Sequence, residues 1–260
     1  MDAGACHVAR NAIPTPRVVA SARHLYPEAL SFLTEHPPFA ELDSASVKAL
    51  ASRCRRRSWR PGETLFLEGQ PCRDLHILVS GRVKCFRSSP EGREQILKIF
   101  ERTGDMFCTT SAFSTGSHII TAGAMNDVSL YVIDVETIKR VALEKPAMAL
   151  ALVTAAGDQM LSLVSLADDL SLKTATTRVA KLLWERAQAQ GGRPGREVRL
   201  QRASLREDDV AAMVGTIRVH VSRSLKALAT MGAITLDRDS IRIKDLEALQ
   251  SFLHAIEPES

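Results

Sequence analysis

The sequence predicts an α+β fold made of a β-roll, one long helix and a small helical unit that ends in a strand pair, in that order. Three observations predict it. Short apolar segments between turn residues fill residues 59–134, a long helical pattern begins at Pro146, and two short amphipathic segments flank a glycine near residue 215. A chain of 260 residues is long enough to give such units cores of their own.

The composition is that of a globular protein, with 45% hydrophobic and 25% charged residues. No uninterrupted apolar run approaches the ~20 residues that span a bilayer, and the first residues lack the pattern of a secretory signal. We therefore expect a cytoplasmic protein with no membrane partner.

The cysteines give no sign of a disulfide framework. Their number is odd, and no two stand at C-x-x-C spacing; they are Cys6, Cys54, Cys72, Cys85 and Cys108. For the same reason the sequence offers no support for a zinc site or an iron–sulfur cluster bound by clustered cysteines.

Residues 1–37, which are rich in proline, are predicted to be an N-terminal extension with a helical stretch over Pro27–Glu35. A β-roll domain is expected over 38–145 and begins with a helix from Ser44 to Arg53. Its predicted strands are 64–67, 75–79, 83–87, 95–100 and 128–133. Short strands with turns every 8–12 residues are typical of a sandwich, a barrel or a jelly roll (a double-stranded β-helix).

A dimerisation helix is predicted over 146–173. Its apolar residues follow one another at spacings of 3, 4, 3, 4 and 3; they are Val153, Ala156, Met160, Leu163, Ala167 and Leu170. This is the pattern of a two-helix seam and favours a homodimer, the alternative being an amphipathic helix packed on its own domain. After a kink near Thr174 a further helix, 176–188, opens the last domain, 174–260.

Within that domain, residues 205–214 and 218–230 are predicted helices joined by a turn at Gly215. Five apolar residues can lock the two helices together: Ala211, Val214, Val221, Leu225 and Leu228. The outer face of the second helix then carries Arg218, Val219, Ser222, Arg223 and Lys226, with His220 beside them. A strand pair over 232–243 resembles a wing.

Helix, glycine turn and helix with exposed arginine is the helix-turn-helix pattern, in which Arg reads guanine. Residues 173–226 hold twelve Lys or Arg and five Asp or Glu, a local net charge of +7 that suits double-stranded DNA. The alternative is a small helical interaction domain with a solvated basic surface.

Several motifs occur together in order. They are Pro61–Gly62–Glu63, Glu68–Gly69, Leu75–Gly81, Glu91–Gly92–Arg93–Glu94, Gly104–Asp105, the long helix, and Val214–Gly215 followed by Arg218 and Ser222–Arg223. Over 38–245 the chain thereby resembles the family of the cyclic-AMP receptor protein and the fumarate–nitrate reductase regulator, the CRP/FNR family. The resemblance implies a homodimeric regulator that binds a palindromic operator and, through loops such as 88–93 and 190–195, RNA polymerase.

The departures from the family bear on the effector. Thr109 and Ile119 stand where the cyclic-AMP branch has a Glu for the ribose and an Arg for the phosphate, so cyclic AMP is not expected. The N-terminal cysteine cluster of the oxygen-sensing branch is missing. Val219 replaces a base-reading Glu of that branch, which should change part of the base preference. We expect the effector pocket at Phe107, Cys108, Thr109, Thr110 and Ile119.

The stretch Gly104–Cys108 is similar to the carbon-monoxide-sensing haem regulators of that family, in which the matching Cys ligates oxidised haem. In those regulators a His two residues later replaces the Cys when the haem is reduced. That position is Thr110 here, and His76 or His118 could serve instead. Haem on Cys108 is thus one hypothesis. A redox-active thiol, an apolar effector, no effector and an ordinary buried thiol are the others.

Two rival functions follow. One is a haem- or thiol-based redox or gas sensor in which DNA binding is secondary. The other is an enzyme with a jelly-roll metal pocket, which needs an H-x-H pair and a Glu. Because the roll offers only His76 and His118, we do not expect an enzyme.

Overall fold

The computed structural model describes residues 17–18, 22–193 and 195–254. They form two compact units, one drawn from residues up to 85 and from 98 to 159, the other from 86 to 97 and from 160 onward. Cys6 and most of the predicted extension lie outside the described residues. The α+β class is confirmed, and the domain boundaries of the sequence analysis stay predictions.

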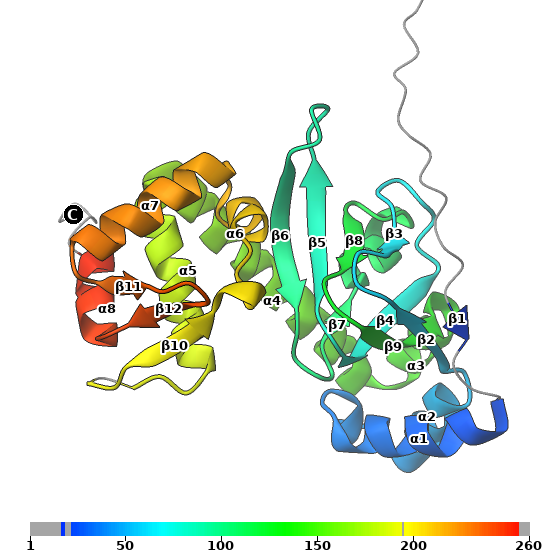
Figure 1. The fold of residues 1–260 in the computed structure, drawn as a ribbon. Coiled ribbons are helices and arrows are strands. Elements are labelled where there is room, and N and C mark those ends of the chain that lie inside the picture. The colour runs from blue at the N-terminus through cyan, green and yellow to red at the C-terminus, as the bar shows by residue number, and fades with distance from the viewer. Residues whose placement is uncertain (1–16, 19–21, 194, 255–260) are drawn as a thin grey trace, which may run out of the picture. The chain divides into compact units, whose positions relative to one another are not determined.

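Two sheets build the β-roll (Figure 1). One has the order β1 (Arg17–Val18), β2 (Arg55–Trp59), β9 (Val128–Asp134), β4 (Asp74–Ser80) and β7 (Met106–Phe107). The other has the order β3 (Thr64–Phe66), β8 (Thr121–Ala124), β5 (Val83–Ser88) and β6 (Glu94–Phe100). Apolar side chains of both sheets, Trp59, Leu78, Val83, Phe107 and Leu130 among them, pack into one buried cluster.

Three helices cover the first sheet with a second apolar cluster. They are α1 (Ala22–Glu35), α2 (Ser44–Ala51) and α3 (Val135–Glu144). Asp43 caps α2, because its carboxylate accepts hydrogen bonds from the backbone amides of Ala45 and Ser46 at 3.1 and 3.0 Å. The helix predicted over Pro27–Glu35 is α1, which begins five residues earlier than expected. The helix α3 was not predicted.

The long helix α4 spans Pro146–Leu172 and leaves most of its apolar side chains on the surface. Met148 is its buried residue, whereas Val153 and Met160 are each 68% exposed. By length and composition the helix could cross a bilayer, and only 6% of its most apolar window is buried. The helix holds no uninterrupted apolar run of that length because Thr154, Asp158 and Gln159 interrupt it.

The second unit packs helices around a three-stranded sheet (Figure 1). The sheet order is β10 (Val198–Gln201), β12 (Ser240–Ile243) and β11 (Ile234–Leu236), and the helices are α5 (Ala175–Ala189), α6 (Glu207–Val214), α7 (Arg218–Thr230) and α8 (Leu246–His254). The winged helix-turn-helix is confirmed, and the five residues expected to lock α6 to α7 are all buried. β10 and α8 were not predicted.

Arg178 of α5 joins the ends of two helices. Its Nε donates to the Val214 carbonyl at 2.6 Å and its Nη1 to the Lys173 carbonyl at 2.6 Å. Longer bonds reach the carbonyls of Asp169 (3.3 Å) and Gly215 (3.4 Å). The last carbonyls of a helix lack partners within it and carry partial negative charge, so one guanidinium serves the end of α4 and the end of α6 together.

Candidate functional site

The outer face of α7 presents the polar residues that the sequence analysis placed there. Arg218, Val219, His220, Arg223 and Lys226 are exposed, and Ser222 is half-buried. Val221, Ser224, Leu225 and Leu228 occupy the opposite face and are buried. The helical period thus separates an exposed, largely polar face from a buried packing face.

Arg218, at the first turn of α7, already has acidic partners. Its Nε lies 3.3 Å from Glu207 Oε2 and its Nη1 lies 3.8 Å from Asp208 Oδ2, both in the first turn of α6. The Arg218 side chain is still 66% exposed. Such surface ion pairs contribute about 0–1 kcal/mol, so a stronger acceptor can take the guanidinium away.

The five residues expected to line an effector pocket do not share one environment. Phe107 lies in the core of the roll, stacked on His76 with ring centroids 5.2 Å apart, whereas Ile119 is 41% exposed. Thr109 is buried, and its hydroxyl accepts a hydrogen bond of 3.2 Å from the Gln159 amide of α4. The hydroxyl at the position of the family's ribose ligand is therefore engaged by the protein itself.

Thr109 and Thr110 line a groove of about 580 Å³ with Phe113, α3 and α4. Val153 and Ala156, two residues of the predicted seam, lie in its wall. Because its walls are almost wholly apolar, the groove suits an apolar partner rather than an anionic nucleotide.

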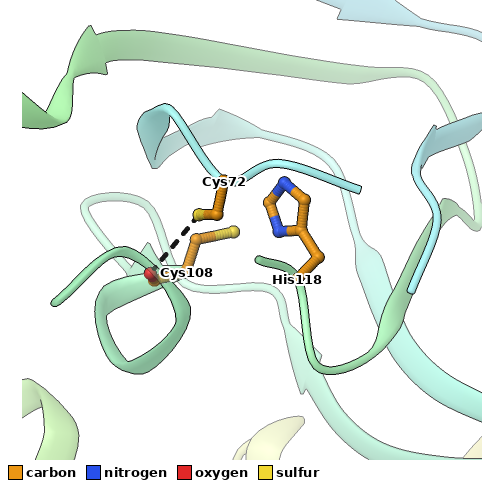
Figure 2. Close-up of side chains that lie close together, drawn as sticks. All are labelled: Cys72, Cys108 and His118. Atoms are coloured by element: carbon orange, nitrogen blue, oxygen red, sulfur yellow. Dashed lines mark hydrogen bonds between the residues drawn. The ribbon is translucent and has the colours of Figure 1, made fainter. Parts of the chain in front are cut away.

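Two thiols and an imidazole converge at the edge of the roll, as Figure 2 shows. The ligand atoms of Cys72, Cys108 and His118 all lie within 4.8 Å of one another. Cys72 precedes β4, Cys108 follows β7, and His118 precedes β8. Two backbone bonds hold the outer segments side by side, from Cys72 N to Gly116 O and from His118 N to Gln70 O, both 2.8 Å.

The pKa values of the two thiols are shifted in opposite directions. The pKa of Cys72 is lowered to about 5, chiefly by the adjacent Cys108 thiol and to a smaller extent by the nearby His118 imidazole. Burial is the main reason that the pKa of Cys108 is raised. By contrast, burial alone raises the pKa of Cys54 and of Cys85 to about 12. Of the four described cysteines, Cys72 is therefore the one whose thiolate is favoured.

Cys108 also has an unusual backbone. Its φ of 72° is positive, the one such value at a described residue other than glycine. This left-handed conformation costs a side-chain-bearing residue on the order of 1–2 kcal/mol, and strain of this kind is concentrated at functional sites. The strained turn directs the Cys108 sulfur toward Cys72 and His118 (Figure 2).

This cluster is not visible in the cysteine spacing. Its three ligands are separated by 36 and 10 positions and are brought together by the strand pairing of the roll. The close approach of Cys72 and Cys108 was therefore not predicted. The one available signal was His118, which had been noted as a neighbour of Cys108.

The surroundings fit a small ion better than a haem. The Phe66 ring stacks on the face of the His118 ring with centroids 3.7 Å apart, which fixes the imidazole with its Nδ1 edge toward the two sulfurs. The donor atoms converge on one point instead of facing each other across a flat macrocycle.

Two family models match the chain. The cyclic nucleotide-binding domain matches residues 56–145, and the Crp-like helix-turn-helix domain matches residues 177–252. The matches coincide with the β-roll and with the unit that carries α6 and α7.

Three known proteins illustrate the likeness. The CRP-like cAMP-activated global transcriptional regulator of Mycobacterium tuberculosis is 29% identical over 81% of this chain and 93% of its own length. The fumarate and nitrate reduction regulatory protein of Escherichia coli is 28% identical over 75% of this chain and 77% of its own. A CooA mutant from Carboxydothermus hydrogenoformans superposes with a TM-score of 0.68 at 24% identity, covering 91% of this chain and 98% of that one, and shows the same fold.

Proposed function

Because the chain belongs to the CRP/FNR family of transcription regulators, we propose that it binds a palindromic DNA operator as a homodimer, through α7. The observation that carries the proposal is the polar outer face of α7 above a buried apolar face. Arg218, Ser222 and Arg223 make the base contacts, Val219 and His220 lie against base edges, and Lys226 contacts the backbone. In a twofold dimer the two helices enter successive major grooves about 34 Å apart.

The operator is obtained by selecting duplexes from a random library, and affinity is then measured by fluorescence anisotropy at several salt concentrations. Arg223→Ala is expected to cost about 1–3 kcal/mol and to relax the preference at one base position in each half-site. Lys226→Ala should weaken binding to all sequences and reduce the salt slope by about 1. Lys48→Ala, an exposed lysine of α2, is the matched control. Binding unaffected by Arg223→Ala would contradict the assignment.

The homodimer rests on α4. Its exposed seam residues Val153, Met160, Leu163 and Leu170 need an apolar partner, and the groove beside Val153 and Ala156 continues the same surface. A second copy of the helix supplies that partner at the spacing of the seam. A membrane would also cover apolar side chains, but the charged Asp168 and Asp169 near the end of α4 favour a protein partner in water.

Two leucines of α4 give a sharp test, because both are exposed and only one lies at the seam. Leu163→Glu should convert the dimer to monomers in sedimentation velocity, since it places two carboxylates opposite each other. Leu161→Glu, one helical position outside the seam, should leave the dimer intact. Dissociation by Leu161→Glu alone would refute the register, and a wild-type monomer would refute the dimer.

The effector we propose is not cyclic AMP. Thr109 is bonded to Gln159, and Ile119 offers no charge to a phosphate. Titration calorimetry should give no heat with cyclic AMP up to millimolar concentration, and micromolar binding would overturn this part. The alternative is a haem- or thiol-based redox or gas sensor that uses Cys108, which the cluster with Cys72 and His118 favours. A Soret band in protein made with ample haem would identify the sensor as haem-based.

Action on transcription then takes place in the cytoplasm and requires RNA polymerase, which loops 88–93 and 190–195 are placed to contact by family analogy alone. Transcription in vitro from the selected operator, with those loops replaced by glycine–serine, tests the contact. Unchanged transcription would remove the loops from the proposal.

A further inference from the structure

The Cys72–Cys108–His118 cluster has the donor set of a metal centre. Thiolate and imidazole ligands are preferred by Zn²⁺ and by softer ions, whereas Mg²⁺ and Ca²⁺ select oxygen. In a tetrahedral zinc site the bond lengths of about 2.3 Å to sulfur and 2.0–2.1 Å to nitrogen place ligand atoms about 3.5–3.8 Å apart. Since the three atoms already lie within 4.8 Å of one another, a shift of at most about 1 Å closes them around an ion.

A second observation points to a ligand. His118 is only 6% exposed, and its Nδ1 atom is buried. Nevertheless, this nitrogen has no hydrogen-bond partner in the described part of the chain. Figure 2 shows this side of the ring facing the two sulfurs. Buried polar atoms are normally satisfied, so an orphaned nitrogen that faces two thiols calls for an electrophile between them.

The scaffold holds the three ligands without the ion. Cys72 and His118 are fixed by the paired backbone of 69–72 and 116–118, which includes a further bond of 2.7 Å from Gly69 N to His118 O. Cys108 is fixed by its left-handed backbone and by the bond of 2.9 Å from Ala112 N to its carbonyl. A preformed site loses little conformational entropy when it binds an ion.

We propose that Cys72 Sγ, Cys108 Sγ and His118 Nδ1 bind one divalent ion of the Zn²⁺ class, with the fourth tetrahedral position left to water or a small ligand. Both sulfurs bind as thiolates, so any proton still held by a thiol is released to solvent, and no electron transfer is involved. The site lies one residue from Thr109, whose hydroxyl holds Gln159 of α4. The ion is therefore placed where the roll meets the dimerisation helix.

The test uses the full chain, reduced and freed of metal with a chelator, and Co²⁺ as a spectroscopic probe. One Co²⁺ per chain should give sulfur-to-cobalt charge-transfer absorption in the near ultraviolet and strong visible bands of tetrahedral cobalt. One equivalent of Zn²⁺ should abolish both. Absence of these bands, with Cys72 and Cys108 shown to be reduced by thiol titration, would overturn the proposal.

Variants separate the site from folding. Cys108→Gly removes the thiol and suits the positive φ, so the chain should fold at least as well and bind no cobalt; His118→Gln should lose the bands as well. Cys54→Ala, a buried thiol outside the cluster, should keep them. Bands that persist in Cys108→Gly would refute the site. So would metal-free protein in which Cys72 and Cys108 are joined in a disulfide, if it still takes up no metal after reduction.

Discussion

Replacing Arg178 by alanine is expected to destabilise the second unit. The side chain is partly buried and donates four hydrogen bonds to the terminal carbonyls of α4 and α6, two of them 2.6 Å long. Hydrogen bonds from a charged group contribute about 1.5–3 kcal/mol each. Counting only the two short bonds at the lower limit, because water can reach the freed carbonyls, gives a loss of about 3 kcal/mol, or roughly a hundredfold in local stability.

The assay uses the placement of the two tryptophans. Trp184 packs against the core of the second unit and Trp59 lies in the core of the β-roll, so a Trp59→Phe background makes fluorescence report on the second unit. Urea unfolding of Arg178→Ala in this background gives the change in free energy. Arg178→Lys should recover at most half, because an ammonium cannot span both helix ends. A loss below about 0.5 kcal/mol for the alanine variant would refute the reasoning.

Three further outcomes are expected. Burial lowers the pKa of His76 to about 3, so below about pH 6.5 the unfolded chain binds a proton that the folded chain does not. The free energy of unfolding should therefore fall toward pH 4 by about 1.4 kcal/mol per pH unit. Thermal unfolding of His76→Gln should lack that slope. Parallel curves for the two proteins would contradict this. The pKa of Asp43 is lowered by the hydrogen bond from Lys145 and by those of Ser46, so Asp43→Ala should lower the urea midpoint at pH 7 and have little effect in strong acid; an equal effect at both pH values would exclude the ionised cap. Gly215→Ala should cost at least about 1–2 kcal/mol by Trp184 fluorescence, because φ is +65° and the new Cβ would lie 2.3 Å from Leu170 Cδ2; a neutral result would show that the turn is free to move.

Elements with local signals at both ends could be predicted from the sequence. α7 was predicted with both of its observed ends, because a glycine turn precedes Arg218 and a break follows Thr230. β2 was missed, since Arg55, Arg56 and Arg57 resemble no apolar strand. The position of β2 is set by its antiparallel pairing with β9. Contacts with a neighbouring strand can outweigh the strand propensity of the residues themselves.

The candidate sites divide in the same way. The exposed face of α7 follows from a single helical period, and its residues were predicted one by one. The cluster of Cys72, Cys108 and His118 depends on contacts between three loops that the sheets bring together, and no spacing in the sequence encodes it. The bond between Thr109 and Gln159 is likewise tertiary, and the family comparison of Thr109 indicated only that a ligand group was missing.

The ion pairs of Arg218 with Glu207 and Asp208 have a consequence for searching a genome. Phosphates of any duplex attract this guanidinium, but they must compete with two carboxylates that are already in place. A guanine edge that accepts two hydrogen bonds, or a phosphate that forms a charge-assisted pair with the guanidinium, has to replace these contacts. In the complex we propose, the acidic turn of α6 therefore lowers the affinity that Arg218 adds for any duplex by at most about 1 kcal/mol, and only a duplex with a well-placed acceptor recovers it.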